Sequence, residues 1–198
     1  MRPFRPRPTS SFVSTVVAVT VLPFALFAAD SASAQALSCL GSAATIVGSN
    51  NANHIRGTSH RDVIVGMGGN DVISGNGGHD TICGGAGNDR LIGDFGNDIF
   101  RFDSAFIGVA NIDTVADFNA ADDVIQLDHT CFAGLALGQL SASAFALDSA
   151  AGTAPQIVYD TSTGALFYDS NGADAGGATG FATVSGKPPL NETNFFVV

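Results

Sequence analysis

The sequence is poor in basic side chains, in glutamate and in long helix-forming residues. Among 198 residues, 8 are Lys or Arg and 18 are Asp or Glu, so the formal net charge is −10. This balance argues against nucleic acids and anionic membranes as partners, because both require patches of Lys and Arg. Glu192 is the only glutamate, there is no tryptophan, and 24 residues are glycine. Aspartate and glycine favour turns whereas glutamate favours helices, so the composition predicts little helix.

The sequence also lacks the common catalytic motifs. None of its 4 histidines is followed by glutamate, so the zinc-protease motif H-E-x-x-H is absent. His60 and His79 fall at variable positions of a glycine-rich stretch, where solvated turn residues are expected. The chain contains neither a G-x-S-x-G nucleophile elbow nor a phosphate-binding loop. We therefore expect that the chain is not an enzyme.

The first 34 residues are predicted to be a leader. Arginines occur within residues 2–7, an apolar run extends from about Phe12 to Ala29, and small residues follow at 32–34. This order is typical of a secretory signal peptide, which predicts a secreted protein with no membrane insertion after cleavage. The alternative is an uncleaved membrane anchor, but the run is barely long enough to span a bilayer and Pro23 interrupts it.

A nine-residue repeat occupies residues 39–103, and its register never changes from Cys39 onward. Position eight of each unit is a large apolar residue, position six is aspartate in the last five units, and position one is glycine in six units. A disordered Gly/Asn/Asp tract would have no use for such regular apolar residues. The position-eight residues are Ile46, Ile55, Ile64, Ile73, Ile82, Leu91 and Phe100, and the position-six residues are Ala44, Asn53, Asp62, Asp71, Asp80, Asp89 and Asp98.

This period predicts a parallel β-roll. Three residues around position eight form a short strand with that side chain inside and its two neighbours outside, and the six residues between strands reverse the chain. Two units then complete one coil, and coils stack at a spacing of roughly 4.8 Å. The position-six residues consequently alternate between two edges of the roll. One edge carries Asn53, Asp71 and Asp89, and the other carries Asp62, Asp80 and Asp98.

The stacked carboxylates predict several bound calcium ions. Like charges at about 5 Å repel each other, and a Ca²⁺ between neighbouring turns reverses the sign of that interaction. Calcium takes six to eight oxygens, which aspartates and the carbonyls of glycine-rich turns can supply. We expect about three strong sites and one or two weaker ones, the weaker ones involving Asp62 and Asn53. The predicted ligands are Asn53, Asp62, Asp71, Asp80, Asp89, Asp98 and turn glycines that include Gly66, Gly68, Gly75, Gly77, Gly84 and Gly87.

The units resemble the calcium-binding nonapeptide G-G-x-G-x-D-x-U-x of the repeats-in-toxin (RTX) family. The resemblance covers five consecutive units that carry both the aspartate and the apolar residue. It implies a calcium-binding protein, which agrees with the secretory leader. One buried apolar residue per nine-residue unit is too little to order the backbone, so we expect folding to depend on the ion. The biological partner of the protein, a protein or a surface, is not indicated.

Residues 104–198 predict an antiparallel β cap or sandwich, with strands near 113–118, 123–128, 156–160, 165–169, 181–184 and 195–198. This region resembles the C-terminal part of the serralysin metalloproteases, without their catalytic half. The resemblance implies that Asp113 helps to close the last calcium site and makes Asp117 a second candidate; the alternative is that both are ordinary turn residues. It also leaves a second interpretation open, in which the chain is a freestanding relative of that domain and acts with a separate catalytic chain.

Three cysteines allow at most one internal disulfide. Some secreted proteins that resemble this repeat stretch carry cysteines at the places of Cys39 and Cys83, which implies a bond between these two and leaves Cys131 single. Ideal roll geometry does not favour it, because Cys39 begins a turn and Cys83 ends a strand two coils away, whereas a disulfide needs Cα atoms within about 7 Å. Both alternatives remain open at this point.

Overall fold

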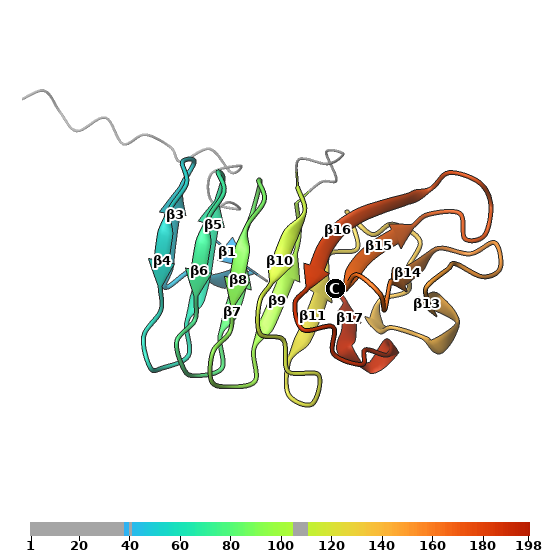
Figure 1. Ribbon diagram of the computed structural model, residues 1–198. Coiled ribbons are helices and arrows are strands. Elements are labelled where there is room, and N and C mark those ends of the chain that lie inside the picture. Colours follow the sequence, from blue (N-terminus) through green and yellow to red (C-terminus); the bar gives the residue numbers. More distant parts are fainter. Residues whose placement is uncertain (1–37, 40, 105–110) are drawn as a thin grey trace, which may run out of the picture.

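A computed structural model describes residues 38–39, 41–104 and 111–198 of the chain, so the predicted leader lies outside the described residues. Almost all of the described regular structure is β-strand, arranged in one eight-stranded sheet, one seven-stranded sheet and a small hairpin (Figure 1). The strands formed by the repeats and their immediate continuation are β3 (Ile46–Ser49), β4 (His54–Arg56), β5 (Val63–Met67), β6 (Val72–Ser74), β7 (Thr81–Cys83), β8 (Arg90–Ile92), β9 (Ile99–Phe102), β10 (Asp113–Val115) and β11 (Val124–Leu127).

The other elements lie before and after the roll. Two short 3-10 helices, η2 (Ala142–Ala144) and η3 (Glu192–Asn194), lie in the C-terminal region. None of the helices in the described ranges is long and apolar enough to cross a membrane. The remaining strands are β1 (Ser38–Cys39), β2 (Ser42–Ala43), β12 (Gly138–Gln139), β13 (Phe145–Leu147), β14 (Gln156–Tyr159), β15 (Ala165–Asp169), β16 (Ala178–Val184) and β17 (Phe195–Val197).

The repeats form the predicted parallel β-roll. Successive strands alternate between the two sheets, so that β3, β5, β7 and β9 neighbour one another in one sheet and β4, β6 and β8 in the other. Each position-eight residue lies beside the one two units later, as Ile64 does beside Ile82 and Ile73 beside Leu91. The position-eight side chains from Ile64 to Phe100 are fully buried between the sheets, whereas Ile46 and Ile55 are partly buried. The all-β fold and the two-unit coil predicted from the sequence are therefore confirmed.

The roll continues beyond the last nine-residue unit. β10 pairs in parallel with β8, and β11 pairs in parallel with β9, so each sheet gains a further rung. The expectation that these two segments belong to an antiparallel cap is wrong. Asp113-Thr-Val115 and Asp123-Val-Ile125 keep the aspartate two residues before the apolar side chain, which is the spacing that places a strand in the roll. The nine-residue repeat ends near residue 103, but both sheets continue through β10 and β11.

Beyond β11, the C-terminal region contains antiparallel pairs. The predicted hairpin is present, with β14 antiparallel to β15 and β15 antiparallel to β16. β16 and β17 then return to the roll and pair in parallel with β10 and β11. One hydrophobic core accordingly runs from the roll into this region, where Phe102, Phe132 and Phe181 make edge-to-face ring contacts at centroid distances of 5.1 Å.

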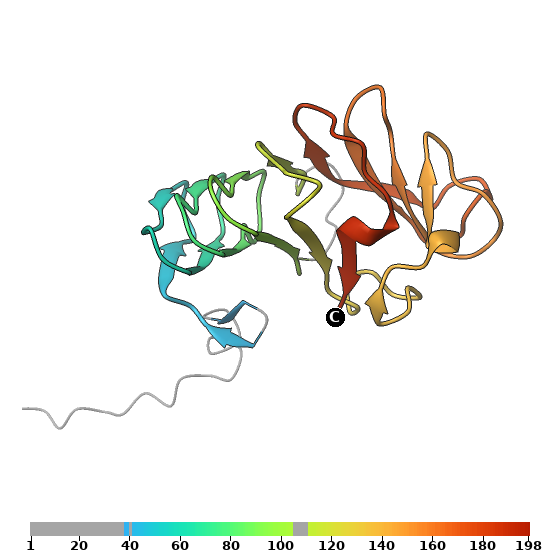
Figure 2. The same ribbon diagram turned by 90° about the horizontal axis from the view of Figure 1, so that it is seen from below.

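The first unit departs from roll geometry, and the departure permits the disulfide. β1 and β2 form a separate two-stranded hairpin that lies to one side of the roll (Figure 2). This position brings the Cα atoms of Cys39 and Cys83 to 6.2 Å, and the two cysteines form the disulfide that the resemblance implied. Cys39, Val63, Val65 and Cys83 make a small second cluster on the outer face of β5 and β7. The side chains that flank position eight were expected to face solvent, and here they are buried instead.

Candidate metal centre

The turns between strands place the position-six side chains in two rows, one along each edge of the roll. Within a row, the backbone N–H of each position-six residue donates to the carboxylate Oδ1 of the residue two units later. The distance is 2.8 Å from Asp62 to Asp80, from Asp80 to Asp98 and from Asp71 to Asp89. Each aspartate therefore holds the preceding turn of its own row through one carboxylate oxygen.

The second carboxylate oxygen is buried and has no donor in four of these residues. Among the residues that the structure describes, the Oδ2 atoms of Asp71, Asp80, Asp89 and Asp98 are enclosed without a hydrogen-bond partner; we call them the free Oδ2 atoms. The four residues are at most 2% exposed. A buried polar atom without a partner is costly, and far more so when it carries charge. A cation beside each of these oxygens would remove that cost.

Glycine at position one makes room beside each free Oδ2. A Cβ atom on Gly66, Gly75, Gly84 or Gly93 would lie only 2.3–2.5 Å from the Oδ2 of the aspartate in the same turn. The carbonyl oxygens of the next rung approach the same place, since Gly84 O would lie 2.3 Å from a Cβ on Gly66. Carboxylate and carbonyl oxygens thus gather around a space that only glycine leaves open. This is the hard-oxygen surrounding that Ca²⁺ prefers.

The two residues that were expected to bind weakly use their oxygens for hydrogen bonds. Asp62 Oδ2 accepts from the backbone N–H of Thr58 at 2.7 Å and from its hydroxyl at 2.9 Å, and Asp62 Oδ1 accepts from the Thr45 hydroxyl at 3.0 Å. Asn53 Oδ1 accepts from the Ser49 backbone N–H at 2.7 Å. The hydroxyl residues at these turns supply donors that the glycine-rich turns lack, so these two side chains have less need of an ion.

The pKa values follow the same division. Burial raises the pKa of Asp89 and of Asp98 from 3.8 to about 6, and it also raises the pKa of Asp71 and Asp80. Burial would raise the pKa of Asp62 as well, but the hydrogen bonds from Thr58 and Thr45 outweigh it and lower that pKa. The four aspartates with free Oδ2 atoms thus resist ionisation in the metal-free fold, which is the condition that a bound cation relieves.

The predicted glycines separate into two groups. Gly66, Gly75 and Gly84 form the spaces just described, and Gly93, which the prediction did not include, does the same for Asp98. The shared position one was the signal for Gly93. Gly68 and Gly77 have nothing within 3.4 Å of a Cβ position and instead bridge to Ala86 and Phe95. Gly87 has a φ of +127° and packs closely on Gly69 O, so its role is in the turn.

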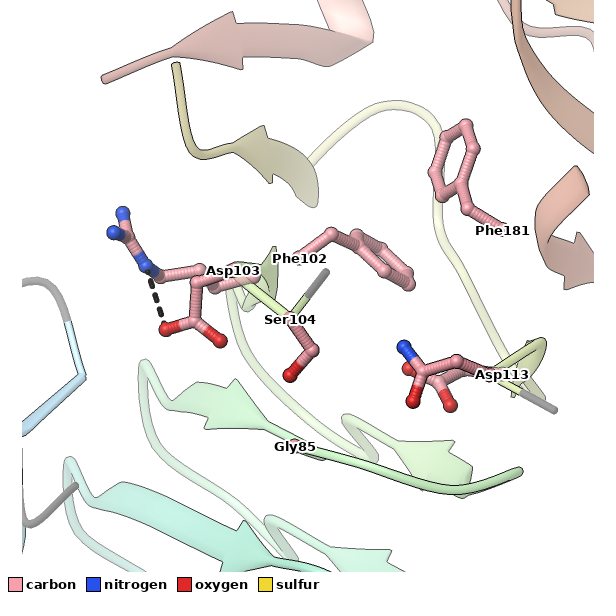
Figure 3. Close-up of a pocket in the computed structure, with 8 residues that line it drawn as sticks. Gly85, Phe102, Asp103, Ser104, Asp113 and Phe181 are labelled. Atoms are coloured by element: carbon pink, nitrogen blue, oxygen red, sulfur yellow. Dashed lines mark hydrogen bonds and ion pairs between the residues drawn. The ribbon is translucent and has the colours of Figure 1, made fainter. Parts of the chain in front are cut away.

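Asp113 closes one row. Its Oδ1 accepts from the backbone N–H of Asp89 at 3.0 Å, in the same way as within the repeats. Asp103, Ser104 and Asp113 lie over the backbone of Gly85 around a cavity of about 10 Å³, enough for one water molecule or ion (Figure 3). Burial, together with the charges of Asp89 and Asp103, raises the pKa of Asp113 to about 8. The predicted site residue therefore lies at the end of the row, among other oxygen donors.

The other row ends at a residue that the sequence did not single out. Asp123 Oδ1 accepts from the backbone N–H of Asp98 at 2.9 Å, and its Oδ2 accepts from Asn119 N–H at 2.8 Å. Asp117, which the resemblance had suggested, accepts from the N–H groups of Gly93 and Asp94 at 2.9 and 2.8 Å. Asp123 could have been predicted from the sequence, because it lies two residues before Ile125, as the position-six aspartates lie two residues before the apolar residue at position eight.

Side chains alone do not surround a metal ion here. Within the described ranges, no three His, Cys, Asp or Glu side chains form a group that could hold one. An ion at a free Oδ2 would therefore depend on backbone carbonyls for most of its ligands. Calcium accepts such carbonyl-rich surroundings, whereas zinc and other transition metals favour nitrogen and sulfur ligands.

Residues 47–104 match the sequence model of the RTX calcium-binding nonapeptide repeat (4 copies), in segments 47–82, 56–91 and 75–104. Among solved structures, the fold is similar to the AlgE6R3 subunit of the mannuronan C5-epimerase from Azotobacter vinelandii, with 28% identity, a TM-score of 0.51, and coverage of 75% of this chain and 79% of that one. The AlgE6R2 subunit of the same enzyme shares the fold at 24% identity and a TM-score of 0.50, over 76% of this chain and 90% of that one. No curated protein matches by sequence.

Proposed function

Because residues 47–104 are RTX calcium-binding nonapeptide repeats, we propose that the chain is a secreted calcium-binding module that folds when it takes up several Ca²⁺ ions outside the cell. The observation that carries this proposal is the set of four free Oδ2 atoms. Each is a carboxylate oxygen that is buried beside glycine and carbonyl groups and that needs a cation. The chain has a structural or interaction role in this proposal and no catalytic one.

Coupling between calcium and folding is supported by the small hydrophobic core of the roll. Each nine-residue unit contributes at most one fully buried apolar side chain between the sheets, which is little to set against the ordering of its backbone. A ligand that binds the folded state and not the unfolded state adds its binding free energy to stability. The fold would then form in the millimolar calcium of the extracellular space and not in the low calcium of the cell interior.

Secretion is supported by two observations. The residues at 1–34 have the order of a signal peptide, and the Cys39–Cys83 disulfide belongs to a protein that matures in an oxidising compartment. Sequencing the N-terminus of the exported protein tests this part of the proposal. The expected first residue is Gln35, and an intact leader on the mature protein would contradict it.

The test of calcium-dependent folding is a titration of the purified chain followed by far-ultraviolet circular dichroism. We expect a largely disordered chain with excess chelator and a β-sheet spectrum with Ca²⁺. Magnesium should substitute poorly, because it requires near-octahedral geometry and retains its waters. A cooperative thermal transition in excess chelator, equal to that in calcium, would overturn the proposal.

A second candidate function is an accessory role beside a separate catalytic chain, such as a serralysin-type protease. It is favoured by one observation, namely that the two similar solved structures are subunits of an enzyme. Co-purification of the chain with an enzyme from its native secretome, abolished by chelator, would support this role. Recovery of the chain alone in calcium would exclude it.

A further inference from the structure

The N-terminal coils are the least supported part of the roll. Ile46 and Ile55 are only partly buried, whereas the position-eight residues that follow them are fully buried. The turns of Asn53 and Asp62 contribute no free Oδ2 atom, because hydroxyl and backbone donors occupy their oxygens. Both calcium and hydrophobic burial therefore contribute less at this end than in the centre.

The disulfide lies at this weak end. It joins residues separated by 44 positions, and the loop that it closes contains four turns, those of Asn53, Asp62, Asp71 and Asp80. The β1–β2 hairpin is held over β5 and β7, where Val63 and Val65 are at most 7% exposed. Thr45, which follows the hairpin, exchanges hydrogen bonds with Val63 and donates to Asp62. The covalent bond thus stabilises the same stacked coils that calcium stabilises.

We propose that the Cys39–Cys83 disulfide sets the calcium concentration at which the roll folds, and that bound calcium in turn protects the disulfide from reduction. This inference rests on the proposed calcium-dependent folding and identifies how it is regulated. The coupling is reciprocal by thermodynamic necessity, since the disulfide and the ions both favour the one folded state. The chain would therefore respond to two properties of its compartment, its calcium concentration and its redox state.

The redox step exchanges two electrons. Oxidation of the two thiols by a small disulfide such as oxidised glutathione forms the Sγ–Sγ bond and releases two molecules of reduced glutathione, which carry the two protons. A dithiol such as dithiothreitol reverses the step and becomes a cyclic disulfide. Both reagents act by thiol–disulfide exchange, so no metal or further cofactor is needed.

The size of the effect follows from the length of the closed loop. Closing a loop of this length shifts the folding equilibrium by about 10³-fold in the chain-entropy description. If one ion accompanies each of the four free Oδ2 atoms, the shift is shared among four binding steps. The half-saturating calcium concentration should then rise about fivefold when the disulfide is lost.

The first test compares calcium titrations of the full chain, of the variant with Cys39→Ser and Cys83→Ser, and of Cys131→Ser. Cys131 is outside the disulfide, so its variant controls for the loss of a cysteine. We expect the midpoint of the double variant to rise about fivefold and that of Cys131→Ser to stay unchanged. Equal midpoints for all three would overturn the inference and leave the proposed function intact. A wild-type chain that takes up no calcium would overturn both.

The second test keeps the inference falsifiable if the double variant does not fold at any calcium concentration. The wild-type disulfide is equilibrated with reduced and oxidised dithiothreitol, in calcium and in chelator, and the remaining thiols are alkylated and counted by mass spectrometry. Calcium should lower the equilibrium constant for reduction by up to about 10³-fold. The same constant in calcium and in chelator would overturn the coupling.

Discussion

At the scale of single residues, the two carboxylate oxygens of one aspartate have different roles. Asp80 uses Oδ1 to accept the N–H of Asp62, while its Oδ2 lies buried beside Gly75. The hydrogen bond sets the spacing of the coils, and the free oxygen makes the same turn a candidate ligand. Asparagine could perform the first role but not the second, because it keeps one oxygen acceptor and loses the charge.

The first prediction separates two glycines of a single turn. In Gly75→Ala, the new Cβ would lie 2.3 Å from Asp80 Oδ2 and 3.0 Å from Gly93 O, so it would occupy the space proposed for an ion. We expect a loss of about 1–3 kcal/mol in calcium-dependent stability, as for other overpacked sites. The matched control is Gly77→Ala, where the nearest atom is 3.8 Å away and φ lies outside the left-handed region. Calcium titration by calorimetry measures both, and equal losses would contradict the assignment.

The roles of these glycines could not be predicted from the sequence. Positions one, three and four are all glycine-rich, and the sequence alone gave no reason to rank them. Position one matters because its Cα faces the carboxylate five residues later, as Gly84 faces Asp89. Gly87 at position four has a left-handed φ instead, and Gly68 at position three has open space. The role of each glycine depends on the local curvature of the backbone, which cannot be read from the residue types.

At the scale of the elements, the turns of each row depend on their neighbours. The turn of Asp80 lies between those of Asp62 and Asp98, and backbone hydrogen bonds connect it to both. In such a stack each unit is stabilised chiefly by the units beside it. A change in the centre of a row should therefore affect two inter-turn spaces, whereas a change at its beginning affects one.

The second prediction compares Asp80→Asn with Asp62→Asn. Asp80→Asn retains an acceptor for the Asp62 N–H but replaces a free Oδ2, so we expect a calcium affinity about tenfold weaker, or about 1.4 kcal/mol, at the sites it serves. Asp62→Asn should change the midpoint by less than about threefold, because Thr58 and Thr45 already occupy both carboxylate oxygens. Calorimetry gives the midpoint and ion number of each variant. The same ion loss in both would show that the free Oδ2 atoms are not the ligands.

Prediction from the sequence was most successful where the period is strict. The strands at Ile64, Ile73 and Ile82, and the two rows of side chains, follow directly from a nine-residue spacing. It was less successful at both ends. β10 and β11 keep the Asp-x-apolar triplet but follow longer connections, so the break in period concealed their parallel pairing. The β1–β2 hairpin has roll-like residues, yet its position depends on a covalent bond and on the outer face of β5.

At the scale of the whole molecule, different interactions stabilise different parts of one continuous pair of sheets. The disulfide supports the N-terminal coils, the free Oδ2 atoms mark the central turns, and aromatic contacts such as Phe132–Phe181 fill the core of the C-terminal region. Because β16 and β17 pair with β10 and β11, the C-terminal region caps the open end of the roll. The roll and the C-terminal region therefore share both large sheets and one hydrophobic core.

The last prediction concerns pH, which should act in opposite directions on the metal-free and the calcium-bound molecule. Burial raises the pKa of Asp89 and Asp98 to about 6 in the metal-free fold, against 3.8 for an ordinary aspartate. The folded chain therefore binds protons more tightly than the unfolded chain. The stability that these groups contribute is fully present below pH 3.8 and is lost as the pH rises through about 6.

Calcium requires the ionised carboxylates, so protons compete with it over the same range. Between pH 7.5 and pH 5, we expect the calcium midpoint to rise by about tenfold, while the folded fraction in calcium-free buffer increases. Circular dichroism at several pH values measures both quantities on one sample. The matched control is Asp89→Asn with Asp98→Asn, in which the metal-free fold should lose part of its pH dependence and keep the part due to Asp113, whose pKa burial raises to about 8. A calcium midpoint that is the same at the two pH values would mean that these buried carboxylates do not bind the ion.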